Sequence, residues 1–166
     1  MKFYIFFIAI AFFFSCVSSQ REVAKAPPVI DDADVLTDAE EARISSQIEE
    51  LSSSIGAEIA VYTTTSLAGA DINSVSLQKA QELGLGRRNK DDGLLFYLAI
   101  KEKEVRIEVG YGLESIIKDE VAAEIIREQL VPYFKEGQFA TGLERGIAAT
   151  IKLIRENESL IGTRPQ

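Results

Sequence analysis

The chain has 166 residues, with 18 Lys and Arg against 26 Asp and Glu, a formal net charge of −8, one Cys and no His. This length suits one domain of ordinary size and leaves no room for a second. The excess negative charge repels nucleic acid phosphates and anionic lipids, so we expect no nucleic acid partner. The lack of histidine excludes Ser-His and Cys-His catalytic pairs and imidazole metal ligands.

The start of the chain predicts export. Its first fifteen residues carry one lysine and an apolar run too short to span a bilayer, so we expect a signal peptide over residues 1–19. Two processing routes are open. The small residues before Gln20 suit signal peptidase, whereas residues 13–16 loosely resemble a lipobox, which would place a lipid on Cys16. The expected compartment is periplasmic or extracellular, with membrane attachment only through Cys16.

A helix opens the expected domain. Residues 20–27 are expected to be a linker, and residues 28–157 one domain. Thr37 and Glu40 have the spacing of a capping box, which predicts a helix over residues 38–55. The apolar residues of that helix recur at steps of three and four, which gives it one face for a core.

A strand, a second helix and a hairpin follow. Residues 57–64 are rich in β-branched and aromatic side chains and predict a strand. Asp71 can cap an amphipathic helix that Gly84 ends. Residues 93–100 are apolar without alternation, which is typical of a central strand covered on both faces. Residues 105–109 alternate apolar and charged side chains and complete a hairpin with that strand.

Two helices close the domain. One begins at Asp119 and is ended or kinked by Pro132, and the other covers residues 140–156, followed by a tail over residues 158–166. The order of elements predicts an α/β fold. We expect a three-layer α/β/α sandwich, with a small mixed sheet of about four strands and helices on both faces.

Carboxylates and glycines gather at the ends of the predicted strands. Because ligands bind at strand ends in open α/β sheets, we expect these residues to line one acidic depression. The expected cation ligands are Asp31, Asp91, Asp92 and Asp119, and the turn of Gly110, Tyr111 and Gly112 is expected to bind the ligand. A purely structural interpretation is also open. An Asp-Gly pair is ordinary turn chemistry, Asp119 can cap a helix, and the glycines can allow a tight exit from the hairpin.

The available donors indicate which metal such a depression would take. Carboxylate, hydroxyl and amide oxygens bind hard cations, so we expect calcium, with magnesium or another divalent cation as alternatives. The chain has no contiguous EF-hand loop, and a site must therefore be assembled from separate loops. Arg87 and Arg88, close to Asp91, could bind a phosphate next to the metal, or could simply be solvated cations that balance the acidic turn.

Three motifs in this order resemble those of the TPM domain family. They are the Val-x-Asp-x-Ala-x-x-Leu that starts at Val29, the Asp-Asp-Gly that ends at Gly93 and the Gly-Tyr-Gly-Leu-Glu that starts at Gly110. The similarity covers about residues 28–155. It implies an α/β fold, calcium binding in some members and phosphatase activity in at least one, a thylakoid acid phosphatase. A photosystem II repair factor in the family implies accessory roles as well.

These observations lead to one preferred function and two alternatives. The preferred hypothesis is an exported accessory module that binds calcium in the acidic depression and presents that surface to a protein partner of unknown identity. The first alternative is a metal-dependent, acid-phosphatase-like phosphate ester hydrolase, in which a divalent ion activates water or a carboxylate attacks phosphorus. The second is a scaffold or assembly factor whose acidic turn only solvates the surface. No catalytic residue is assigned.

Overall fold

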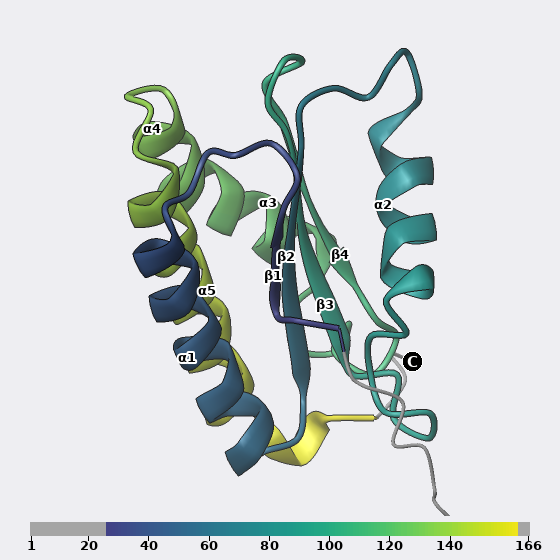
Figure 1. Cartoon of the computed structure of the whole chain (residues 1–166). Coiled ribbons are helices and arrows are strands. Elements are labelled where there is room, and N and C mark those ends of the chain that lie inside the picture. The colour runs from purple at the N-terminus through teal and green to yellow at the C-terminus, as the bar shows by residue number, and fades with distance from the viewer. Residues whose placement is uncertain (1–25, 163–166) are drawn as a thin grey trace, which may run out of the picture.

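A four-stranded sheet lies between helices in the structure, a computed structural model that describes residues 26–162 (Figure 1). The strands lie in the order β1 (Val29–Asp31), β2 (Glu58–Thr64), β3 (Gly93–Ala99) and β4 (Glu104–Val109). The first three strands are parallel, and β4 is antiparallel to β3. The predicted α/β fold with a small mixed sheet is therefore confirmed. The expected signal peptide, Cys16, most of the linker and the end of the tail lie outside the described residues.

The larger core lies between the sheet and the helices on one face. Helices α1 (Asp38–Ser54) and α5 (Phe139–Glu156) pack there (Figure 1). The capping box at the start of α1 is present, as predicted: the Thr37 side chain accepts from the Glu40 amide, and Glu40 accepts from the Thr37 amide. The largest fully buried side chains of this core include Ile44, Leu51, Phe96, Leu113, Leu130, Leu143, Ile147 and Ile154.

Another helix covers the opposite face. Helix α2 (Ile72–Glu82), capped by Asp71 as predicted, contacts β3 and β4 and covers a smaller apolar cluster (Figure 1). The buried members of that cluster are Ala60, Leu67, Leu95, Tyr97 and Ala99. Leu77, an apolar residue of α2, is 48% exposed. Ser76 is buried instead, and its hydroxyl contacts the Glu108 carboxylate at 3.0 Å.

Strand β3 is the central strand that its composition predicted. All seven of its residues are buried, because helices cover both of its faces and strands flank both of its edges. Strand β4 alternates as expected. Ile107 belongs to the larger core, whereas Arg106 and Glu108 form an ion pair with 2.8 Å between Nε and Oε2.

The short strand β1 is not among the elements that the sequence patterns predicted. It begins after Pro27 and Pro28, which have no N–H to donate to a neighbouring strand. The Pro28 carbonyl still accepts a hydrogen bond from the Val61 amide at 2.8 Å. Strand β1 therefore pairs only with the second half of β2, at Val61, Tyr62 and Thr63.

The helix before Pro132 neither ends nor simply kinks at that residue. Helix α3 (Asp119–Ile125) widens into a π-helix at Ile126–Leu130 and continues as α4 (Val131–Phe134). A proline in an α-helix would clash with the carbonyl four residues before it. The widened turn avoids that clash, because the Val131 amide donates to the Ile126 carbonyl, five residues before it.

Within residues 26–162, no helix is both long enough and apolar enough to cross a bilayer.

Candidate functional site

The direction of β4 decides which of the predicted site residues meet. Because β4 is antiparallel to β3, its carboxyl end lies beside the amino end of β3, with Val109 opposite Leu94. The loop at residues 84–92, which enters β3, and the turn at residues 110–112, which leaves β4, therefore lie side by side. This is the amino end of the three parallel strands.

The loop and the turn are joined through their backbones. The Gly110 amide donates to the Gly93 carbonyl at 2.8 Å, and the Gly112 amide donates to the Asp91 carbonyl at 3.0 Å. The end of the described chain closes on the same place, because the Gly162 amide donates to the Gly112 carbonyl at 2.9 Å. We call this contact between residues 84–93 and residues 110–112 the loop–turn junction.

Glycine is required in the junction because the two backbones are too close for side chains. A Cβ atom on Gly112 would collide with the Lys90 carbonyl oxygen, and one on Gly110 with the Asp91 carbonyl oxygen. A Cβ atom on Gly93 would lie 2.5 Å from the Leu85 carbonyl carbon. The tight hairpin exit that the sequence suggested is thus explained, and close backbone packing adds a second reason for these glycines.

Asp92 is buried in the junction, with 0% of its surface exposed, and is fully paired. Its Oδ1 accepts from the Arg87 amide at 2.8 Å, and its Oδ2 accepts from Arg87 Nε at 2.8 Å and from Arg87 Nη2. This hydrogen bonding raises the pKa of Arg87, which keeps the guanidinium charged. The two residues that we expected to bind a metal and a phosphate therefore bind each other.

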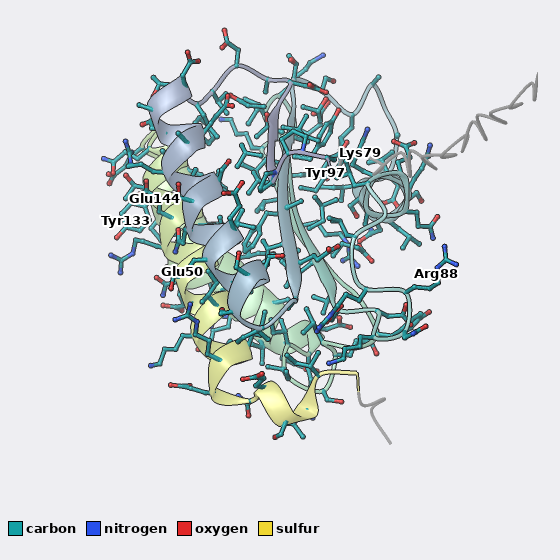
Figure 2. The ribbon with its side chains drawn as sticks, turned by 60° about the horizontal axis from the view of Figure 1, so that its bottom comes forward. Glu50, Lys79, Arg88, Tyr97, Tyr133 and Glu144 are labelled. Carbon is teal, nitrogen blue, oxygen red and sulfur yellow. The ribbon has the colours of Figure 1, made fainter. Side chains whose placement is uncertain are left out.

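Several side chains at the junction are exposed. Asp91 and Arg88 are exposed, and Figure 2 shows Arg88 pointing away from the ribbon. Tyr111 is 66% exposed, the highest value among the exposed large hydrophobic residues of the described chain. The junction thus presents an aromatic ring, a guanidinium and a carboxylate on a backbone that is held by hydrogen bonds.

Asp31 lies at the other end of the sheet. It pairs with Thr63, which is five residues along β2 from Glu58, the partner of Gly93. At about 3.3 Å per residue, this places Asp31 on the order of 16 Å from the junction. The single depression that we expected to join Asp31 to Asp91 and Asp92 is therefore not formed.

The contacts of Asp31 fix the start of α1. Its Oδ1 accepts from the Thr63 hydroxyl, and its Oδ2 accepts from the Leu36 amide at 2.7 Å. Asp31 also belongs to an acidic run. Burial, followed by the charges of Asp31, Asp38 and Asp34, raises the pKa of Glu41. Carboxylates therefore repel one another at this end of the sheet, although in residues 26–162 no group of three or more is arranged to hold a metal ion.

Asp119 is separate from both places. It is the exposed first residue of α3, and the N-cap is Lys118, so the cap that we considered for Asp119 is wrong. An acidic side chain in the first helical turn still stabilises the helix through its dipole. Among the described residues, no hydrogen bond or ion pair connects Asp119 with the other three aspartates.

Two residues that form hydrogen bonds at these ends of the sheet, Glu58 and Thr63, were not predicted from the sequence. Glu58 Oε2 accepts from the Gly86 amide at 2.8 Å, which holds the 84–92 loop against β2. The Thr63 hydroxyl contacts Asp31 and also accepts from the Ala33 amide at 3.1 Å. A charged residue at the start of an apolar strand was the available signal for Glu58. A threonine within a strand gave no such signal for Thr63.

These features define a class of protein: a single α/β domain whose sheet ends in a glycine-dependent junction between an Asp-Asp-Gly loop and a Gly-Tyr-Gly turn. The TPM domain matches residues 29–153, which is most of the chain. The chain therefore belongs to the TPM domain family. A comparison with curated proteins gave no match.

Solved structures from three bacteria have a similar fold. The solution structure of the N-terminal domain of a protein from P. gingivalis is 28% identical, with a TM-score of 0.75 over 87% of this chain and 91% of that chain. The BA42 protein of Bizionia argentinensis is 23% identical, with a TM-score of 0.64 over 73% and 82%. The N-terminal domain of the cg2496 protein of Corynebacterium glutamicum is 15% identical, with a TM-score of 0.60 over 98% and 92%.

The junction predicts a large effect for one added methyl group. Gly112→Ala should lower the free energy of unfolding by about 3 kcal/mol, because backbone must move to admit the Cβ atom. Gly137→Ala is the control. Gly137 has a φ of +73° and nothing within 4 Å of an added Cβ, so only the cost of the left-handed conformation, about 1 kcal/mol, should appear. Urea unfolding of both variants measures the difference, and equal losses would contradict the packing argument.

Proposed function

We propose that this TPM-domain protein is an exported accessory module that binds a protein partner at the loop–turn junction. The observation that carries the proposal is the way in which the junction uses its residues. The glycines pack against the facing backbone and Asp92 is hydrogen-bonded to Arg87. Tyr111 and Arg88, by contrast, are exposed. Tyrosine and arginine are the side chains that contribute most often to the energetic centre of protein interfaces.

Rigidity of the junction favours this role. A side chain on well-ordered backbone loses little conformational entropy when a partner binds it. Tyr111 lies between two glycines whose amides are hydrogen-bonded to the facing loop.

Export is supported by the lysine and the apolar run at the start of the sequence.

Phosphate ester hydrolysis is the weaker proposal. Such a reaction needs a carboxylate that can attack phosphorus or hold a metal, and a cation that can hold the substrate. The candidates were Asp91 and Asp92 for the carboxylate and Arg87 or Arg88 for the cation, and the mutual hydrogen bonds of Asp92 and Arg87 would have to break before either of those two could act. The partner-binding function requires no such rearrangement.

Site-specific crosslinking tests the partner-binding surface. A photo-crosslinking phenylalanine derivative at position 111 should give one reproducible adduct in the producing cell, and Arg88→Ala should reduce its yield about tenfold, as for a residue at an interface centre. The same derivative at position 77 is the control, because Leu77 is also exposed but lies on α2. Equal adducts at both positions, or none at position 111, would contradict the proposal.

Calcium binding remains a prediction from the sequence, and the predicted carboxylates lie in separate parts of the fold. At the junction, Asp92 offers no unpaired carboxylate oxygen. In the acidic run at residues 31–41, burial and then the charges of Asp31, Asp38 and Asp34 raise the pKa of Glu41, and a bound cation would offset that charge repulsion.

A calcium titration followed by amide NMR distinguishes these places, with magnesium as the control. We expect saturable shifts within residues 31–41 and none at Asp92.

Glu41→Gln should also raise stability at neutral pH. A folded pKa above the unfolded value means that ionised Glu41 opposes folding, and this effect should disappear as the pH falls below the unfolded pKa. Saturable shifts at Asp92, or a Glu41→Gln variant that is less stable at neutral pH, would contradict this interpretation.

A further inference from the structure

A cavity of about 500 Å³ lies between the β3–β4 hairpin and α4, at the end of the molecule opposite the junction. Figure 1 shows α4 and the hairpin tip at this same end. The walls are apolar and come from three parts of the chain: Leu98, Ile100 and Val105 of the hairpin region, Val131 and Phe134 of α4, and Phe139 at the start of α5. Ligand pockets in proteins have volumes of about 300–1,000 Å³, so the cavity is large enough for a small molecule.

The packing of Phe134 explains why the cavity exists. Phe134 lies against α5 at Gly142, where a Cβ atom would be only 2.6 Å from its ring. Its ring also packs on that of Phe139, with 5.3 Å between the ring centroids. Both contacts hold Phe134 toward α5. The space between α4 and the hairpin is therefore bounded by aromatic and aliphatic side chains and is not filled by them.

The exposed lining of the cavity is positively charged on balance. Lys103 and Lys135 lie there with one carboxylate, Glu104. In residues 26–162, neither lysine takes part in an ion pair. The two lysines outnumber the single carboxylate of this lining, in a chain whose net charge is −8. Anions should therefore be attracted to this entrance.

We propose that this cavity binds a small amphiphile with an alkyl body and a single anionic head group, such as a medium-chain carboxylate. The alkyl chain lies against Leu98, Val105 and Phe134, and the head group lies between Lys103 and Lys135. The apolar walls provide most of the binding energy, and the lysines select the sign of the head group. This inference is independent of the partner surface at the loop–turn junction.

Two probes with equal alkyl chains and opposite charges test the proposal. Decanoate and decyltrimethylammonium are titrated below their micelle-forming concentrations into the purified protein, and side-chain and amide NMR signals are followed. We expect saturable shifts at Leu98, Val105 and Phe134 with decanoate, and at least about fivefold weaker binding of the cation, since two exposed charge pairs contribute roughly 0.5 kcal/mol each.

Substitutions at the entrance then test the role of charge. The double substitution Lys103→Gln and Lys135→Gln should weaken decanoate binding about fivefold and remove the preference for the anion. Lys101→Gln is the matched control, because Lys101 is exposed in the same hairpin but does not line the cavity. Equal affinity for both probes, a lack of saturation with decanoate, or an equal effect of Lys101→Gln would each overturn the proposal.

Discussion

The fit between the 84–92 loop and the 110–112 turn is the constraint on which this end of the structure depends. Two backbones meet there so closely that Gly110 and Gly112 cannot carry a Cβ atom, and Asp92 is buried against Arg87 beneath them. The loop positions β3, the central strand, and the turn ends β4. Loss of Arg87 would leave the buried Asp92 carboxylate unpaired, which costs several kcal/mol.

Because β4 is antiparallel to β3, the Asp-Asp-Gly and Gly-Tyr-Gly motifs contact each other and have a structural role. In open α/β sheets, ligands usually bind at the carboxyl ends of the parallel strands. The Asp-Asp-Gly and Gly-Tyr-Gly motifs meet at the opposite, amino end, where they join β3 to β4. Tyr111 and Arg88 are exposed at this junction, and the proposed partner surface is therefore centred on them.

Most of the fold could be predicted from the sequence, because its signals are local. The capping box at Thr37 and the continuous apolar run of β3 each depend on neighbouring residues and gave the correct elements. The site could not be predicted in the same way, because it depends on strand direction. Asp91 and Asp92 precede β3, whereas Asp31 ends β1, and in parallel strands these positions are at opposite ends. The pairing of Asp92 with Arg87 required knowledge of the loop conformation.

A double-mutant cycle on Arg87 and Asp92 tests the structural role of the junction most directly. The free energies of unfolding of Arg87→Ala, Asp92→Ala and the double variant are compared with that of the unchanged protein. We expect the two single losses to sum to more than the loss in the double variant, with a coupling of about 2 kcal/mol. Additive losses would contradict it, because they would show that the two side chains do not stabilise the fold as a pair.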